Sequence, residues 1–144
     1  MGQPKISSRP SRSAAVRLLA AAQLPTEDLT AAHCEHFFYS GPPTEPTGLV
    51  GLELFGDVAL LRSLVVAPER RGTGEGVALL KHAERHARGQ GVTTLYLLTT
   101  TAEAFFAKHG YERASRESAP KAIRATREFA DICPASSAFM KRDL

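Results

Sequence analysis

The feature that most constrains this chain is a glycine-rich turn between a strand-forming segment and a helix-forming one. The aliphatic run "SLVV" ends near Pro68, and "RRGTGEG" then leads directly into "VALLKHAERHAR", whose apolar residues recur at helical spacing. Glycines at positions 72, 74 and 76 carry no Cβ, so the backbone can turn sharply there and lie close to a ligand. This arrangement predicts a strand–loop–helix unit that binds a group at the loop.

The charges around this turn indicate that the bound group is an anion. The first N–H groups of a helix have no partner within the helix, and the helix dipole favours negative charge at that end. Arg70 and Arg71 add two positive charges just before the helix. A phosphate fits this combination better than any other common group.

The spacing of the glycines distinguishes between three phosphate-binding motifs. The dinucleotide fingerprint G-x-G-x-x-G fails because Val77 stands where the third glycine is needed, and the P-loop fails because no lysine follows the glycines. The pattern that is present is R-x-x-G-x-G, formed by Arg71, Gly74 and Gly76. With its strand, proline and helix, "LVVAPERRGTGEGVALL" resembles the acetyl-CoA-binding motif of the GCN5-related N-acetyltransferase (GNAT) superfamily. The alternative interpretation is a β–α turn that binds nothing.

The rest of the chain predicts an α/β protein, a single-domain GNAT fold over residues 1–144 with a mixed central β-sheet flanked by helices. A "GD" turn joins two apolar runs as an antiparallel hairpin. Ser11 or Ser13 is expected to cap the first helix, Thr26 the second and Thr101 the fourth, which Gly110 ends. The expected strands are 5–8, 34–40, 48–55, 58–67, 92–100, 111–115 and 136–142, and the expected helices are 14–22, 27–33, 74–88, 102–110 and 121–132.

Composition excludes several classes of protein. The net charge is +3 over 144 residues, with no tryptophan and no zinc-finger spacing, so we expect no nucleic-acid partner. The first residues lack the apolar core of a signal peptide, and no apolar run approaches membrane-spanning length. Cys34 and Cys133 stand in no metal-binding spacing and are expected to be buried thiols. These observations predict a cytoplasmic protein with no metal and no membrane contact.

Two pairs of histidines are not interpreted as metal ligands. His33 and His36 lie three apart, but nothing in the sequence indicates a third and a fourth ligand. His82 and His86 share one face of the predicted helix among charged neighbours, and Glu84 is misplaced for an H-E-x-x-H motif. The second pair therefore predicts a solvated helix face.

The GNAT resemblance implies a position for acetyl-CoA, which would serve as co-substrate. In that superfamily the strand before the glycine loop diverges from its neighbour, and the pantetheine arm adds to it like a further strand. Here this role falls on Leu64, Val65 and Val66. The pyrophosphate would meet the backbone amides of Arg71, Gly72, Thr73, Gly74, Glu75, Gly76 and Val77.

The resemblance also implies the reaction, a direct attack of a neutral amine on the thioester carbonyl. Glu53 is the best acidic candidate for the general base, although a glutamate on a half-exposed strand is often simply solvated. The N–H of Val66 is expected to stabilise the oxyanion. Many members protonate the departing thiolate with a tyrosine, but Phe106 occupies that position and cannot donate a proton. Water, Thr99 or Thr100 would have to replace it.

The acceptor is expected to be a small-molecule amine. "YLLTTTAEAFFAKHGY" together with "PKAIRATREFADICPASSAFM" resembles a GNAT subgroup encoded in arsenic-resistance operons, which indicates an amino-acid-like amine or one that contains arsenic or phosphorus. Residues 120–132 are expected to form a wall of the acceptor pocket, with Arg124, Thr126, Arg127 and Glu128 offered to a zwitterion. The alternatives are a non-catalytic acetyl-CoA-binding or sensory module and a protein N-terminal or lysine acetyltransferase. Relatives often pair through their last strands, so a homodimer is also expected.

Overall fold

The computed structural model describes residues 5–24, 26, 29–127, 129–130 and 137–144. Within them, one sheet has seven strands in the order β1-β2-β3-β4-β5-β7-β6. The strands are β1 (Ile6–Ser8), β2 (Phe37–Ser40), β3 (Gly48–Phe55), β4 (Val58–Val66), β5 (Thr94–Thr99), β6 (Glu112–Arg113) and β7 (Ala138–Asp143). The helices are α1 (Arg12–Ala21), α2 (Glu75–Gly89), α3 (Glu103–Lys108) and α4 (Lys121–Arg124). The predicted α/β class, a mixed sheet flanked by helices, is confirmed.

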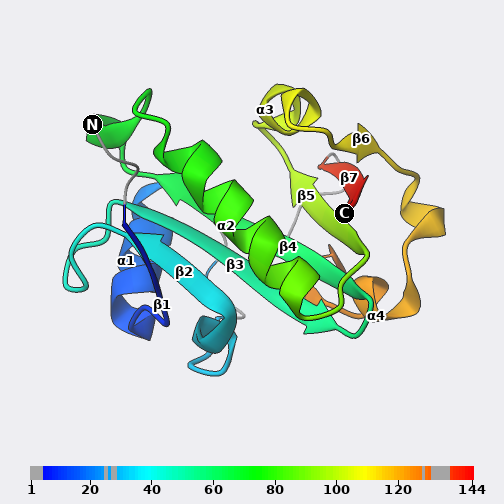
Figure 1. Ribbon diagram of the computed structural model, residues 1–144, viewed down its shortest axis with the longest axis horizontal. Coiled ribbons are helices and arrows are strands. Elements are labelled where there is room, and N and C mark those ends of the chain that lie inside the picture. Colours follow the sequence, from blue (N-terminus) through cyan, green and yellow to red (C-terminus); the bar gives the residue numbers. More distant parts are fainter. Residues whose placement is uncertain (1–4, 25, 27–28, 128, 131–136) are drawn as a thin grey trace.

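The helices cover both faces of the sheet. Helix α2 crosses one face, where Leu79 and Leu80 join a buried cluster with Leu61, and α1 lies behind the sheet (Figure 1). On that opposite face, Leu19 of α1 packs in a second cluster with Phe37. Because side chains alternate along a strand, each central strand contributes to both apolar layers.

The pairing of β4 with β5 is the part of the topology that creates a site. The described strand pairs are all antiparallel except this one, which is parallel. It extends only from Val58 opposite Thr94 to Leu60 opposite Tyr96. Beyond Leu60 the two strands no longer pair, so a gap opens between their carboxyl ends.

Two of the expected helices are wrong in part because threonine side chains bond locally. The segment 29–32 forms no helix, and a 3₁₀ turn at His33–His36 replaces the start of the expected strand 34–40. The Thr30 N–H donates to Nδ1 of His33 at 3.1 Å, while the His33 N–H donates to the Thr30 hydroxyl at 3.3 Å. These bonds give the backbone an alternative to a helical turn. Glu27 and Asp28 lie outside the described residues.

The expected helix 121–132 is interrupted. α4 stops at Arg124, and the Thr126 hydroxyl donates to the Ile123 carbonyl at 2.7 Å, a group that a continuous helix would pair with a backbone N–H. Helical backbone resumes at Arg127 and at residues 129–130, where the Ala130 N–H donates to the Thr126 carbonyl at 2.9 Å. Residues 128, 131 and 132 lie outside the described part of the chain, as does Cys133. Cys34 is buried, as expected.

The helix caps were predicted with mixed success. The Ser11 hydroxyl accepts the Ala14 N–H at 3.2 Å, so Ser11 rather than Ser13 caps α1. Thr101 does not cap α3, because the N-cap of α3 is Ala102. The Ala102 N–H donates to the Thr99 hydroxyl at 3.0 Å.

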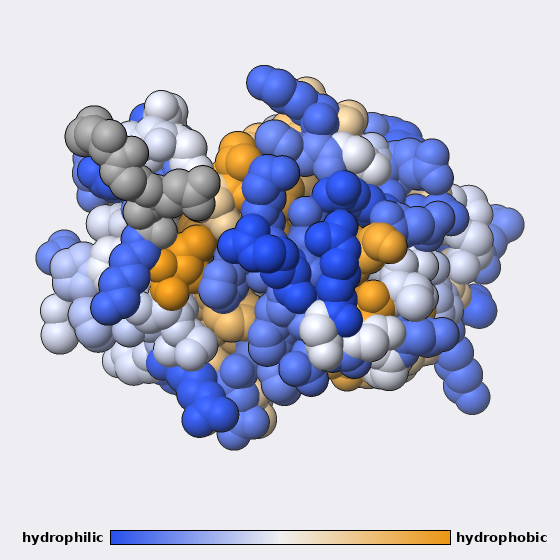
Figure 2. All heavy atoms as spheres, in the orientation of Figure 1, coloured by the Kyte–Doolittle hydropathy of each residue, from blue (hydrophilic) through white to orange (hydrophobic). Residues whose placement is uncertain are grey.

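The outer side of α2 is hydrophilic. Lys81, Arg85 and Arg88 are exposed on it, and blue side chains cover this helix in the space-filling view (Figure 2). Among the residues that the structure describes, no helix combines the length and the apolar character needed to cross a membrane.

The prediction that His82 and His86 form a solvated face is wrong. Both are half-buried, and their rings lie 4.7 and 4.9 Å from the ring of Phe38 on β2. Burial, the largest cause, lowers the pKa of both imidazoles. The neighbouring Arg85 lowers the pKa of His82 further, and His36 does so for His86. The two histidines therefore lie at the edge of the apolar core under α2.

We expect these histidines to make the protein less stable in mild acid. Because their pKa values are lower in the folded state than the ordinary value of about 6.5, unfolding takes up protons below that pH. Their contribution is therefore fully present above about pH 6.5 and is lost as the pH falls through the folded-state values. Urea unfolding at about pH 7.5 and about pH 5.5 measures the loss, and His86→Gln should reduce it.

His109→Gln is the control for this prediction, because His109 is the C-cap of α3 and its ring packs against Phe105 instead of Phe38. It should leave the pH dependence of the urea midpoint as it is in the wild type. An unchanged pH dependence in His86→Gln would contradict the assignment.

Candidate functional site

The gap between β4 and β5 opens into a cleft of about 900 Å³. Its walls come from the end of α1, from residues 61–66 of β4, from the loop before α2, from β5 with α3, and from Ser137. The cleft therefore extends from the point where the two strands separate to the amino end of α2.

The β4 wall includes Leu64, Val65 and Val66, the residues predicted to contact pantetheine. Val65 packs in the cluster with α1, whereas Leu64 and Val66 pack against the cluster under α2. Because β4 has no strand partner on this edge beyond Leu60, its backbone there faces the cleft. An extended ligand could pair with it as a strand would.

A β-bulge in β4 lies beside this edge and was not predicted. The β3–β4 register shifts between Leu49 and Gly51, and Ser63 has a φ of +60° in the left-handed region. The Ser63 hydroxyl accepts a hydrogen bond from Nε of Arg62 at 3.1 Å. Serine is not among the residues enriched at positive φ, so no local signal could have found the bulge.

The glycine loop adopts the conformation that its residues suggest. Gly72 and Gly74 have φ values of +80° and +85°, where other residues are strained, and Gly74 is the N-cap of α2. Arg71 and Gly76 line the cleft. The amides of residues 72–77 thus lie just before and within the first turn of α2, where the helix dipole favours an anion. The Arg71 N–H, which was also predicted to meet the pyrophosphate, donates instead to the Pro68 carbonyl at 3.3 Å.

Glu75 belongs to the predicted cofactor set, but its side chain is directed into the protein. The residue is 2% exposed, and its Oε1 accepts from the Thr47 hydroxyl at 2.8 Å. Its Oε2 lies 3.5 Å from Nε of Arg70. The carboxylate therefore ties the segment before β3 to the glycine loop, and the predicted cofactor contact of Glu75 rests on its amide alone.

The predicted base, Glu53, lies beside the cleft rather than on its wall. It lines a separate hollow of about 420 Å³ with His33, Thr126 and Arg127. Its Oε2 accepts from Nη1 of Arg62 at 3.0 Å, and its Oε1 lies 3.7 Å from Nε2 of His33. Since Arg62 lines the main cleft, this ion pair connects the two cavities.

The structure does not bring together the residues that were predicted to contact the acceptor substrate. Thr126 and Arg127 line the smaller hollow, Arg124 is exposed and lines neither cavity, and Glu128 lies outside the described residues. Among the described residues, no group of three or more His, Cys, Asp or Glu side chains is arranged to hold a metal ion.

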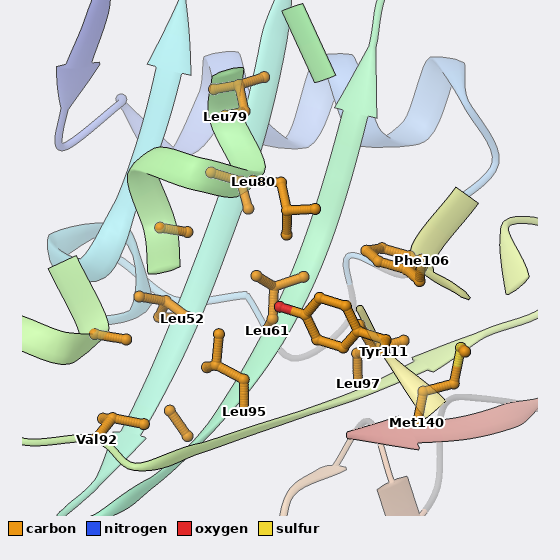
Figure 3. Close-up of a cluster of buried hydrophobic side chains, with 14 of the residues drawn as sticks. Leu52, Leu61, Leu79, Leu80, Val92, Leu95, Leu97, Phe106, Tyr111 and Met140 are labelled. Carbon is orange, nitrogen blue, oxygen red and sulfur yellow. The ribbon is translucent and has the colours of Figure 1, made fainter. Parts of the chain in front are cut away.

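Phe106 lines the cleft from the side of α2 and α3. Its ring packs 5.3 Å from Phe105 and 5.5 Å from Tyr111, and it points into the same apolar cluster as Leu61 and Leu97 (Figure 3). The Tyr111 hydroxyl donates to Glu84 at 2.9 Å, and burial raises its pKa, so it is not poised to release a proton. Thr99 and Thr100 both line the cleft.

Comparison with known proteins agrees with this geometry. The profile of the Acetyltransferase (GNAT) domain family matches residues 32–113, which contain β2 to β6, the glycine loop and most of the cleft wall. An amino-acid acetyltransferase from Ralstonia nicotianae is 42% identical over 64 residues, 44% of this chain and 14% of the relative. The enzyme of the same name from Pseudomonas fluorescens is 42% identical over 66 residues, 46% of this chain and 15% of its own length. The match thus spans about a seventh of these relatives.

Solved structures share the fold of the whole chain. N-acetylglutamate synthase from Neisseria gonorrhoeae, complexed with coenzyme A and N-acetyl-glutamate, superposes with a TM-score of 0.82 at 23% identity and covers 100% of this chain and 36% of its own. A Mycobacterium tuberculosis protein solved with coenzyme A gives a TM-score of 0.78 at 20% identity over 98% of this chain and 99% of its own. The predicted GNAT fold is thereby confirmed, and the chain belongs to the GNAT acetyltransferase domain family.

Proposed function

We propose that this chain transfers the acetyl group of acetyl-CoA to the amine of an amino acid or an amino-acid-like compound. The observation that carries the proposal is the cleft between β4 and β5, which ends at the R-x-x-G-x-G loop and the amino end of α2. An unpaired strand edge and a cluster of helix-terminal amides suit the two parts of acetyl-CoA, its amide-containing arm and its pyrophosphate.

In this arrangement the pantetheine arm lies along Leu64 to Val66, and the pyrophosphate accepts hydrogen bonds from amides of residues 72–77. Arg71, which lines the cleft at that end, adds positive charge. These contacts use backbone groups for the most part, so they depend on the shape of the loop more than on its side chains.

The proposed reaction is attack of the neutral amine on the thioester carbonyl. The new C–N bond forms as the C–S bond breaks, the amine loses one proton, and the CoA thiolate gains one. Glu53 stays a prediction as the base, and its place beside the cleft would require a water to relay the proton. Phe106 cannot donate a proton, so water, Thr99 or Thr100 protonates the departing thiolate.

The nature of the acceptor is supported by the charges of the cleft. Among the described residues that line it, Arg62 and Arg71 are charged and none is acidic, and the charge of Arg62 is paired with Glu53 of the neighbouring hollow. An amine that also carries an anionic group suits these walls better than a polyamine does. The relatives named amino-acid acetyltransferase support the same class. Only the resemblance of the tail motifs to the arsenic-resistance subgroup extends the proposal to amino acids that contain arsenic or phosphorus. The homodimer, the cytoplasmic location and the absence of nucleic-acid and membrane contacts stay predictions.

The proposal is tested by binding and by turnover. Acetyl-CoA should stabilise the folded protein by about 2.7 kcal/mol at a concentration 100-fold above its dissociation constant, because it binds the folded state only. ATP and NAD at the same concentration are the controls and should stabilise the folded protein much less. Acetyl transfer to a panel of amino acids, their phosphorus and arsenic analogues, polyamines and peptides then identifies the acceptor class.

The outcomes separate the alternatives. Binding without transfer to any amine would indicate a non-catalytic module, which Phe106 makes the main competing function. Transfer to peptides alone would indicate a protein acetyltransferase. No stabilisation by acetyl-CoA at millimolar concentration would contradict the proposal altogether.

A further inference from the structure

A buried hydroxyl without a partner lies on the wall of the cleft. Ser137 is 5% exposed, and its Oγ has no hydrogen-bond partner among the residues that the structure describes. Its carbonyl, by contrast, accepts from Nη2 of Arg116 at 3.0 Å. Buried polar groups are nearly always hydrogen-bonded, so an unpaired hydroxyl at a cleft indicates a contact that a ligand completes.

Ser137 stands at a bend directly before β7, whose residues contribute to both apolar layers of the sheet. Ala138 belongs to the buried cluster under α2, and Phe139 belongs to the cluster with Ile123 of α4. Ser137 and Phe106 both line the cleft.

Arg62 also lines the cleft. Its guanidinium is 5.9 Å from the centre of the Phe37 ring, which packs in the cluster with α1. It lies two residues beyond Leu60, where β4 and β5 separate, whereas Arg71 lies at the opposite, loop end. The Glu53 carboxylate that pairs with Arg62 lines the neighbouring hollow. The cleft wall thus carries an unpaired hydroxyl and a charge-paired arginine, and none of the described residues that line it is acidic.

We infer that Ser137 determines acceptor specificity by donating a hydrogen bond to an anionic oxygen of the acceptor, in a cleft whose described lining residues include no acidic side chain. This rests on the proposed function and names the part of the acceptor that is recognised besides its amine. The group is an oxyanion, either the carboxylate of an amino acid or the oxygen of a phosphorus or arsenic acid. The contact holds the acceptor in the cleft while its amine reaches the thioester between the strands.

Ser137→Ala tests the inference. We expect the KM for the amino-acid acceptor to rise about 10- to 100-fold, because a hydrogen bond to a charged group is lost. The KM for acetyl-CoA should not change. The urea midpoint should stay the same or rise, since the substitution removes a buried hydroxyl that has no partner. Ser137→Thr, which keeps the hydroxyl, should retain most of the acceptor affinity.

Two further comparisons of substrates identify the group on the acceptor that Ser137 recognises. The wild type should prefer the free amino acid to its carboxamide, and Ser137→Ala should lose much of this preference. The same comparison with a phosphorus-containing amino acid distinguishes the carboxylate from a phosphorus oxyanion as the group bound. Ser118→Ala removes an exposed hydroxyl that donates to the Ser115 carbonyl, and it should leave both KM values unchanged.

The failure of this inference differs from the failure of the proposed function. If the wild type acetylates amino acids while Ser137→Ala keeps its KM and its preference for the free acid, the inference is wrong and the function stands. A lower urea midpoint with equal rises in both KM values would show a structural role and would also overturn it. If the wild type acetylates no amine, the function and the inference fail together.

Discussion

Gly74→Val should abolish acetyl-CoA binding and leave the sheet folded. Gly74 caps α2 with a φ of +85°, and a Cβ built there would meet no atom of the protein within 4 Å. Backbone strain rather than crowding within the protein is therefore the cause, because a β-branched residue is unfavourable in the left-handed region by about 1–3 kcal/mol. Relief of that strain would turn the loop amides away from the pyrophosphate. Loss of two amide hydrogen bonds to the charged pyrophosphate predicts an affinity for acetyl-CoA at least about 100-fold lower, measured by calorimetry.

Gly89→Val is the matched control for this change. Gly89 is the last residue of α2, and its Cβ would also meet nothing within 4 Å, but its φ is not in the left-handed region. It should keep the wild-type affinity for acetyl-CoA. Arg71→Ala should weaken binding less than Gly74→Val, because backbone amides supply most of the contact. A larger loss in the arginine variant would mean that side-chain charge, not the loop conformation, holds the cofactor.

The fold and the position of the glycine loop follow from local features of the sequence. Aliphatic runs of strand length, the "GD" turn and the helical period of 75–89 are each visible within a few residues. Strands β3 and β4 and helix α2 were accordingly predicted almost to the residue. Glycines at 72 and 74 carry their own conformational signal, and this is why the loop could be interpreted without a structure.

The parts that could not be predicted depend on residues far apart in the chain. Nothing near Glu53 shows that it pairs with Arg62, and the burial of His82 and His86 depends on Phe38 in another strand. Ser137 becomes a candidate only because β7 lies next to β5 at the edge of the cleft. These contacts arise from the order of strands in the sheet, which the local pattern does not specify.

A buried carboxylate on α2 is also a tertiary feature, and it leads to the largest expected change in stability. Glu84 was predicted to lie on a solvated helix face, but it is 3% exposed. Its Oε2 accepts from the Tyr111 hydroxyl at 2.9 Å and from Nη1 of Arg142 at 2.8 Å. The charge thus joins α2 to β7 and to Tyr111, the residue before β6, whose ring belongs to the apolar cluster of Figure 3.

Glu84→Gln should lower the free energy of unfolding by about 2–4 kcal/mol, measured by urea denaturation. The glutamine side chain keeps the volume of glutamate but removes its negative charge, so the Arg142 guanidinium remains half-buried without its counter-ion. Because Arg142 is 30% exposed, water compensates in part, and the loss should be smaller than for a fully buried pair. Tyr111→Phe should cost about 1 kcal/mol, because Glu84 then keeps Arg142 as its partner.

Glu103→Gln is the matched control, since Glu103 also pairs with an arginine, Arg113, but its side chain is 41% exposed. It should leave the urea midpoint almost unchanged, because solvent screens exposed ion pairs. Acetyl-CoA affinity should be the same in Glu84→Gln as in the wild type, since neither Glu84 nor Arg142 lines the cleft. Equal destabilisation by the two glutamine variants would contradict burial as the source of the effect. A loss of acetyl-CoA affinity in the folded Glu84→Gln protein would instead show that this network holds β5 and β7 in the positions that open the cleft.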